Sequence, residues 1–485
     1  MIARLLLRSA LRVVDGRSRV ERPHTREFVM SSIEFGQMML TLGIMLAGAH
    51  GLGYLADRLK QPRLAGEILA GVLLGPFVLK QVSPELFSRL FEASPKVQGS
   101  LGFLYQLGLI LLMFCAGSEA RRLLAKENRA QTYTLIGTAD TVNFALVLGL
   151  GLAGLLPLAL LTGPAGQETS TLLVLAIAVS VTSIPVISRI FWDLGIMHTR
   201  FVSLILGSAV LEDVALWIVL SVAMILATSA TLAAEHVVGN ITSHVFATFA
   251  YVLAALIAMP MLLKRMSGSP WNVIYAASPV GYVIFILLAF CAVAAALEVN
   301  LQFAALLAGY ALVGGLGGTE RARFAGPLEH IAKVSFGVFV PIYFAMIGWR
   351  LVFNHEFSLT ILIGFFAGST ALSLLTSGLA ARLAGFRKLD IINIALTTNA
   401  RGGPGIVLAG LAYEAGIINA AFFTALVLTA VFTSQMAGAW LRFVLAKGWP
   451  LLSTNPDEGA KPIAAPHIND AHLFPSQGVA GREMA

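Results

Sequence analysis

The sequence predicts an all-α polytopic membrane protein with about thirteen transmembrane helices, arranged as two inverted repeats of about six helices each with crossed, discontinuous helices. Three observations support this fold class. Of the 485 residues, 57% are hydrophobic and only 12% are charged, about half of the charged fraction usual in soluble domains. Apolar runs long enough to cross a bilayer recur along almost the whole chain. Two of these runs contain residues that interrupt helices.

The apolar runs define the expected spans in chain order. They are 35–56, 64–80, 101–118, 133–156, 171–190, 203–227, 244–263, 279–297, 301–316, 332–353, 358–383, 391–412 and 417–446. Lys and Arg accumulate in cytoplasmic loops. If the first span enters from outside, the outer loops hold only Lys80, Arg89, Lys96 and Arg350. The net charge of +7 is therefore a topology signal, and we expect a cytoplasmic C-terminus.

Both ends of the chain differ from the apolar segment 35–446. Residues 1–34 form a basic leader whose arginines would resist translocation, and which lacks the apolar core of a signal peptide. We expect either that Met30 is the true start or that a basic arm stays inside and one span is miscounted. Residues 447–485 are polar and proline-rich, which is typical of a disordered tail.

Charged residues within the spans are rare, which suggests that they have a function. Arg401 lies deep in 391–412, Glu212 and Asp213 lie in 203–227, and Asp140 lies in 133–156. Each such charge costs roughly 2.5–3.5 kcal/mol at the centre of a membrane helix. Ion or proton binding is one interpretation, and a buried ion pair that only locks helices together is the other, above all for Asp140.

The adjacent acids cannot have the same role, because neighbouring residues on a helix do not share a face. We expect one of Glu212 and Asp213 to line the site and the other to contact Arg401 or a helix end. Arginine keeps its proton at any accessible pH, so Arg401 is a fixed counter-charge. The carboxylates can bind and release protons.

Two spans are expected to be broken. The span 171–190 contains "SVTSIP", in which Pro185 removes a backbone hydrogen bond beside the hydroxyls of Thr182 and Ser183. The span 391–412 contains a run that can hardly stay helical, namely Asn399, Arg401, Gly402, Gly403, Pro404 and Gly405. The two spans cross the membrane in opposite directions, and each is the middle one of three. Crossed broken helices of this kind build an ion site from half-helix ends and nearby carboxylates.

Several motifs carry a family resemblance. They are "QPRLAGEILAGVLLGP" (61–76), "LGLILLMFCAGSE" (107–119), "SVTSIPVISRIFWDLG" (180–195), "AVLEDVALWIVL" (209–220), "FVPIYFAMIG" (339–348) and "NARGG" (399–403). With these motifs the chain resembles the second family of monovalent cation:proton antiporters, which includes Kef-type, Nap-type and plant cation/H+ exchangers. The similarity covers about 35–445.

The resemblance implies a Na+/H+ antiporter-like fold and a homodimer. The dimer part would be about 35–118 and 279–353, the core part about 133–227 and 358–446, and the linker helix 244–263. The core would move the ion by elevator-type alternating access. The implied ion- and proton-binding residues are Asp213, which would hold the monovalent cation, with Glu212, Thr182 and Ser183. Arg401 would compensate charge. Asp140, which the family pattern does not include, is expected to compensate charge by pairing with Arg401. The residues themselves place the breaks at Pro185, Asn399, Gly402, Gly403 and Pro404.

The chain departs from the family pattern at three positions. Many relatives carry a lysine in the helix before the second break, where this chain has Ser373. Many also have a glutamate four residues after the arginine, where Gly405 stands here, and Asp140 is an unexpected acid. The choice between Na+ and K+ and the number of protons exchanged per cation therefore stay open.

The sequence thus indicates a secondary transporter that exchanges Na+ or K+ for protons in a lipid bilayer, expected to be a bacterial inner membrane. A proton-coupled exporter of an organic cation or metabolite is the alternative, and a sensor that has lost transport is a third. Cys115 and Cys291 form no metal or disulfide motif, and no nucleophile–base pair is evident. We expect no cofactor, no nucleic acid partner and no enzymatic activity.

Overall fold

The computed structural model describes residues 30–59, 61–92, 94–123, 139, 141–183, 246–267, 269, 272–297, 299–315, 318–351, 353 and 357–453, with short stretches between 186 and 227. Four residues of the expected site lie outside the described residues: Asp140, Pro185, Glu212 and Asp213. The expected leader up to residue 29 and the tail after residue 453 lie outside them as well.

The first helix, α2 (Ser32–Arg58), begins where the local sequence supplies a cap. The Ser31 hydroxyl accepts a hydrogen bond from the Glu34 backbone N–H at 3.2 Å. The Glu34 carboxylate accepts one from the Ser31 backbone N–H at 2.8 Å. This reciprocal arrangement satisfies N–H groups that have no partner within the helix and fixes its start.

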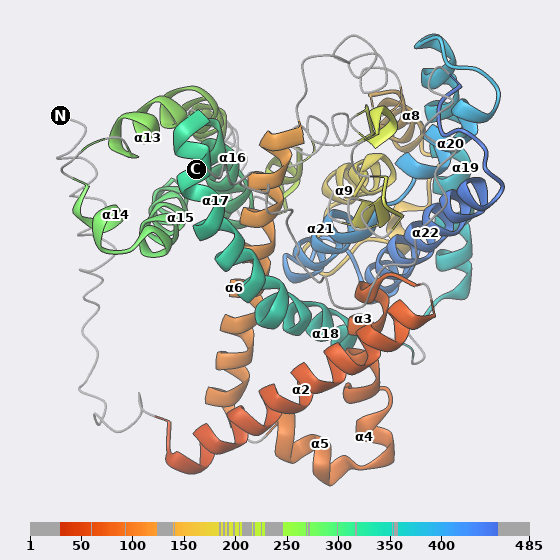
Figure 1. Cartoon of the computed structure of the whole chain (residues 1–485). Helices are drawn as coiled ribbons and strands as arrows, with labels where there is room; N and C mark the ends of the chain where they lie inside the picture. Colours follow the sequence, from red (N-terminus) through yellow and green to blue (C-terminus); the bar gives the residue numbers. More distant parts are fainter. Residues whose placement is uncertain are drawn as a thin grey trace, which may run out of the picture.

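One group of helices packs around α6 (Pro95–Leu123) (Figure 1). Its other members are α2, α3 (Arg63–Leu74), α4 (Leu79–Val82), α5 (Pro84–Phe91), η4 (Ala254–Ala258), α13 (Met259–Ser267), α14 (Val273–Ala277), α15 (Pro279–Ala296), α16 (Leu301–Gly315), α17 (Gly318–Val334), η5 (Ser335–Phe339) and α18 (Val340–Arg350). We call this group the scaffold helices.

Glycines let the scaffold helices touch backbone to backbone. A Cβ atom added at Gly117 of α6 would lie 1.9 Å from the Leu306 carbonyl oxygen of α16. One added at Gly348 of α18 would lie 1.9 Å from the Ile68 carbonyl oxygen of α3. Small residues at helix contacts are the usual means of close packing in a membrane, where water does not drive helices together.

A second group contains both broken spans and is called the core helices (Figure 1, upper right). Its members are α8 (Thr141–Leu152), η3 (Leu158–Leu160), α9 (Glu168–Ser180), α19 (Leu359–Leu383), α20 (Leu389–Thr398), α21 (Gly402–Glu414) and α22 (Ala420–Ala446). Helices α9 and α21 are buried on nearly all sides, so they form the centre of this group. Among the described residues, each helix packs mainly within its own group.

The loops at one end of α9 and α21 pair with each other. The Gly163 N–H donates to the Ile417 carbonyl at 2.9 Å, and the Ala165 N–H donates to the Gly416 carbonyl at 3.0 Å. The Thr171 hydroxyl of α9 also donates to Ile417, at 3.0 Å. These bonds connect the start of one broken span to the end of the other, so the two spans are held side by side.

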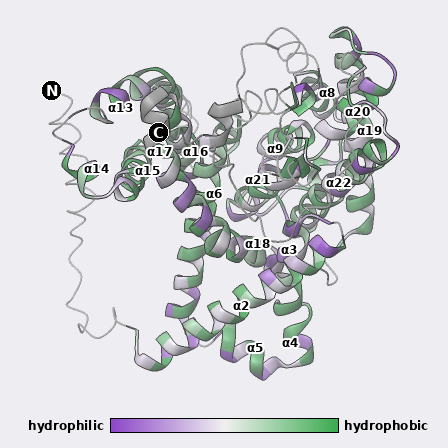
Figure 2. Cartoon of the chain, in the orientation of Figure 1, coloured by the Kyte–Doolittle hydropathy of each residue, from purple (hydrophilic) through white to green (hydrophobic). Residues whose placement is uncertain are grey.

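Eight helical stretches of the described chain are long and apolar enough to cross a membrane, and the second of them combines α3 and α4: Ser32–Arg58, Arg63–Val82, Pro95–Ser118, Phe246–Met266, Pro279–Ala296, Phe324–Arg350, Leu359–Leu383 and Ala420–Ala446. Figure 2 shows the apolar colouring of many of these helices. Large apolar side chains are exposed on several of them, including Leu40, Leu288 and Leu375. That exposure is what a lipid-facing surface requires.

The observed helices differ from the expected spans in two informative places. The span expected over 64–80 is divided, because α3 ends at Leu74 before Gly75 and Pro76. The helix expected over 101–118 runs from Pro95 to Leu123, so polar residues at both ends continue the helix beyond the apolar run.

Candidate functional site

The first broken helix, α9, ends at Ser180. Val181 leaves the helical conformation with φ −68° and ψ 132°, and the chain is not helical through Ser183. Thr182 and Ser183 are 3% and 0% exposed, respectively. The last carbonyls of α9 therefore end inside the protein, where they need partners from elsewhere in the chain.

The second broken span is divided between Thr398, the last residue of α20, and Gly402, the first residue of α21. Gly402 has φ +30°, a conformation that side chains disfavour. A Cβ atom at this position would lie 2.5 Å from the Ser183 hydroxyl oxygen. Pro404 falls in the first turn of α21, where its missing N–H costs no helical bond. Backbone geometry and close contact thus both explain the glycine.

The two breaks cross and satisfy each other's polar groups. The Ser183 N–H donates to the Ala400 carbonyl at 2.7 Å. The Thr182 hydroxyl donates to the Thr398 carbonyl at 2.8 Å. The Ser183 hydroxyl accepts from the Gly403 N–H at 3.1 Å. We call this meeting point of the two breaks the crossing. It holds oxygen atoms and half-helix ends in a buried place, which is the arrangement that ion sites in transporters use.

Arg401 is buried beside the crossing, with 2% of its surface exposed. Its Nη2 donates to the Val179 carbonyl at 3.2 Å, close to the C-terminal end of α9. Both terminal nitrogens also bond Ser369 of α19, through its hydroxyl and its carbonyl, each at 3.0 Å. Nη2 bonds the Ser373 hydroxyl at 3.0 Å as well. The positive charge therefore lies against the negative end of a helix dipole.

The polar face of α19 was not anticipated from the sequence as a unit. Ser369, Ser373 and Thr376 lie at the i, i+4, i+7 spacing of one helix face. The Thr376 hydroxyl bonds the Asn143 side-chain oxygen of α8 at 2.7 Å. Sequence reasoning had singled out only Ser373. The available signal was this polar stripe within a helix that is otherwise apolar.

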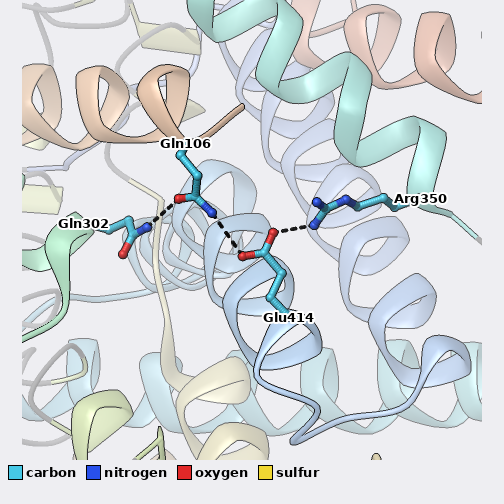
Figure 3. A network of polar contacts seen from close by, with 4 residues as sticks. All are labelled: Gln106, Gln302, Arg350 and Glu414. Atoms are coloured by element: carbon cyan, nitrogen blue, oxygen red, sulfur yellow. Dashed lines mark hydrogen bonds and ion pairs between the residues drawn. The ribbon is translucent and has the colours of Figure 1, made fainter. Parts of the chain in front are cut away.

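A second polar cluster joins the scaffold helices to α21 (Figure 3). The Glu414 carboxylate, at the end of α21, pairs with Arg350 at the end of α18. It also accepts a hydrogen bond from Gln106 of α6 at 3.3 Å, and Gln106 accepts one from Gln302 of α16 at 2.9 Å. The Arg350 guanidinium lies 4.4 Å from the centre of the Tyr105 ring. We call Gln106, Gln302, Arg350 and Glu414 the boundary cluster.

Sequence reasoning missed the boundary cluster. The signal that pointed to it was two glutamines, Gln106 and Gln302, within apolar spans. The part of the chain that the structure describes contains no group of three or more His, Cys, Asp or Glu side chains that could hold a metal ion.

A family model described as "Sodium/hydrogen exchanger, transmembrane" matches residues 43–447. The chain belongs to the sodium/hydrogen exchanger family. It is 26% identical over 417 residues to Cation/H(+) antiporter 17 of Arabidopsis thaliana, covering 82% of this chain but 47% of that protein. It is 24% identical over 419 residues to the Na(+)/H(+)-K(+) antiporter GerN of Bacillus cereus, covering 84% of this chain and 96% of that protein.

Among solved structures, the fold is similar to the sodium proton antiporter MjNhaP1 of Methanocaldococcus jannaschii. The TM-score is 0.54 with 15% sequence identity, over 85% of this chain and 97% of that one. The expected Na+/H+ antiporter-like fold is thereby confirmed. Family membership likewise confirms the expectation of a multi-pass membrane transporter of the cation/proton antiporter class rather than an enzyme.

Proposed function

We propose that this family member is a secondary transporter that exchanges Na+ or K+ for protons. The observation that carries the proposal is the crossing, a buried place where Thr182 bonds Thr398, and where Ser183 bonds Ala400 and Gly403. Relatives named as Na(+)/H(+) and K(+)/H(+) antiporters support the choice of ions. The family's plant members extend well beyond the matched segment, so the proposal concerns the membrane transport unit.

The cation and the proton compete for Asp213 in this proposal. Glu212 either titrates with it or contacts Arg401. The hydroxyl of Thr182 contributes an oxygen atom, because a hydroxyl that donates one hydrogen bond keeps lone pairs for a cation. The hydroxyl of Ser183 accepts from the N–H groups of Val186 and Gly403, so its oxygen is proposed to bind the cation in place of one of these bonds. Since both carboxylates lie outside the described residues, their part in the proposal rests on the sequence and on the family resemblance. A cation that arrives at Asp213 displaces its proton.

Arg401 has a different part. It stays charged at every accessible pH, so it cannot carry the exchanged proton. Its hydrogen bonds to Val179, Ser369 and Ser373 hold the charge beside the end of α9. A fixed positive charge near the carboxylates favours their ionised form and so prepares the site for a cation. Asp140 is proposed as a further compensating charge.

The transport motion proposed is an elevator, in which the core helices slide against the scaffold helices. Support comes from packing that is extensive within each group and sparse between the two groups among the described residues. The proposed units are about 133–227 with 358–446 for the moving core and about 35–118 with 279–353 for the fixed part, linked by 244–263. We further propose a homodimer built through the scaffold helices, with the C-terminus in the cytoplasm of a bacterial cell.

A proton-coupled exporter of an organic cation or metabolite is the second candidate. The position where many relatives carry a lysine is Ser373, whose hydroxyl accepts a hydrogen bond from Arg401 instead. This change in the charges around the crossing favours a different cargo on the same fold. If the substrate is an organic cation, adding it is expected to release protons from the lumen of proteoliposomes, whereas adding alkali metal ions is expected to have no effect.

The test uses purified full-length protein in proteoliposomes that contain a pH-sensitive dye and hold an imposed proton gradient. NaCl, KCl or choline chloride is added outside, and alkalinisation of the lumen is followed. We expect a response to Na+ or K+ that Asp213→Asn abolishes. Glu168→Gln is the matched control, because Glu168 is an exposed acid at the start of α9. Silence of folded wild-type protein to every alkali cation would overturn the proposal.

A further inference from the structure

Asn399 is a buried polar side chain whose polar atoms have no hydrogen-bond partner among the described residues. The residue is 2% exposed, and neither its Oδ1 nor its Nδ2 makes a hydrogen bond within the part of the chain that the structure describes. Burial of an unpaired carboxamide is unfavourable, and nearly all buried polar side chains in proteins are paired. A group of this kind inside a transport protein therefore requires an explanation.

Two other buried asparagines of the core helices show the usual situation. Asn393, on the same helix as the break, donates to the Leu451 carbonyl at 3.0 Å and accepts from the Trp440 indole at 2.9 Å. Asn143 accepts from the Thr376 hydroxyl at 2.7 Å. The core thus pairs its amides elsewhere, and the missing partners of Asn399 are a local property of the break.

The position of Asn399 in the chain places it at the crossing. Its two neighbours, Thr398 and Ala400, give their carbonyl oxygens to Thr182 and Ser183, respectively. It is also the C-cap residue of α20, at the end where the helix dipole is negative and attracts a cation. The backbone of Asn399 thus lies between two residues that bond the other break, and its carboxamide is buried there.

We propose that Asn399 supplies a neutral oxygen ligand to the transported monovalent cation and thereby sets its affinity and selectivity. This inference rests on the proposed function of the crossing. A carbonyl oxygen is the kind of ligand that replaces the hydration shell of an alkali cation. The Nδ2 group donates to a site carboxylate or to a water molecule that the ion brings. Because the ligand is neutral, it strengthens cation binding without adding a proton to the exchange.

The test compares Asn399→Ala with Asn393→Ala in the proteoliposome assay with Na+, K+, Li+ and Rb+. The control removes a paired, buried carboxamide from the same helix away from the crossing. We expect Asn399→Ala to raise KM for the preferred cation by about ten- to a hundredfold, as loss of one interaction with a charged group implies. The maximal rate changes less, and the ratio of responses to Na+ and K+ shifts. The control keeps the wild-type KM and ratio.

A second readout does not depend on transport. In detergent, the preferred cation raises the unfolding temperature of the wild type, and Asn399→Ala loses this increase. If the alanine variant does not fold, Asn399→Asp keeps the shape of the side chain and adds a charge. It is then expected to shift the pH profile of exchange and to tighten cation binding.

Two outcomes overturn the inference, and they differ from each other. In the first, the wild type exchanges ions, but Asn399→Ala leaves KM and selectivity unchanged or Asn399→Asp leaves the pH profile unchanged. Asn399 then has no role in cation binding, and the proposed function still stands. A wild type that responds to no alkali cation removes the proposed function, and this inference is overturned with it.

Discussion

Arg350 and Glu414 form an ion pair between the end of a scaffold helix and the end of a core helix. Their side chains are 25% and 26% exposed, so the pair is partly shielded from water. Gln106 and Gln302 extend the contact onto two further scaffold helices (Figure 3). The two helix groups otherwise pack sparsely in the described chain, so this cluster is a specific contact between them.

A first prediction is that this contact must open during transport. In the proposed elevator motion, α21 slides along α6 and α18, and Glu414 leaves Arg350. Cysteines at both positions, Arg350→Cys with Glu414→Cys, joined by a short bifunctional thiol reagent, are expected to abolish exchange. Exchange should return when a cleavable linker is reduced. The background replaces Cys115 and Cys291 with alanine, and each single cysteine variant treated with the reagent is the control.

The ion pair itself is expected to matter little for stability. Partly exposed pairs contribute about 0.2–1 kcal/mol, so Glu414→Gln should lower the unfolding temperature only slightly. Loss of exchange in the cross-linked protein therefore reports arrested motion and not unfolding. Full activity after complete cross-linking would show that α21 does not move relative to α18, which contradicts the elevator proposal.

The sequence predicted the breaks but not the contacts that surround them. The exact place was wrong, however: Gly402, Gly403, Pro404 and Gly405 were expected not to stay helical, but they form the first turn of α21, and the non-helical residues are 399–401 just before it. Partners of Arg401 in the described chain include Val179, Ser369 and Ser373, which come from two other helices. Such pairings depend on how the helices pack, and one sequence gives no measure of that packing.

The same limit applies to the ends of helices and to the boundary cluster. Hydropathy placed a span over 101–118, yet α6 continues to Pro95 and Leu123, because a helix keeps its backbone bonds beyond the lipid. Gln106 and Gln302 are separated by 196 residues and meet only through the packing of α6 on α16. Their polarity was visible in the sequence, but their common partner was not.

A second prediction concerns the hydrogen bonds of Arg401. Ser373→Ala removes a hydroxyl that lies 3.0 Å from its guanidinium, and loss of a bond to a charged group costs about 1.5–3 kcal/mol. Ser373→Lys is expected to destabilise more, because it brings a second positive charge next to a buried one. Thermal unfolding in detergent measures both. Ser434→Ala is the control, since within the described chain the Ser434 hydroxyl bonds the Ala430 carbonyl of its own helix and no other group.

That prediction has a clear opposite outcome. If Ser373→Lys were as stable as the wild type, Arg401 would have to move away from α19 and find another partner. A lysine would then be compatible with this crossing, as the family resemblance implies. The presence of serine instead of lysine at position 373 would then say nothing about the charge balance of the site. The argument for an organic cation or metabolite as substrate would be weaker.

The last prediction separates two adjacent glycines. Gly402→Ala places a methyl group 2.5 Å from the Ser183 hydroxyl oxygen and 2.6 Å from a Val186 methyl carbon, at a residue with φ +30°. Strain of this kind costs about 1–3 kcal/mol, and relief of the clash would move Ser183 out of the crossing. We therefore expect a lower unfolding temperature and at least a tenfold loss of exchange.

Gly403→Ala is the matched comparison. It adds the same methyl group one residue later, where the backbone is helical. Apart from its own helix backbone and chain neighbours, no heavy atom of the described residues lies within 4 Å of the new carbon. Alanine is the better helix former, so this variant is expected to keep or slightly raise the unfolding temperature. Equal losses of stability in both variants would mean that the run of glycines serves flexibility in general. Unequal losses, with Gly402→Ala the worse, would tie the effect to the contact between Gly402 and Ser183.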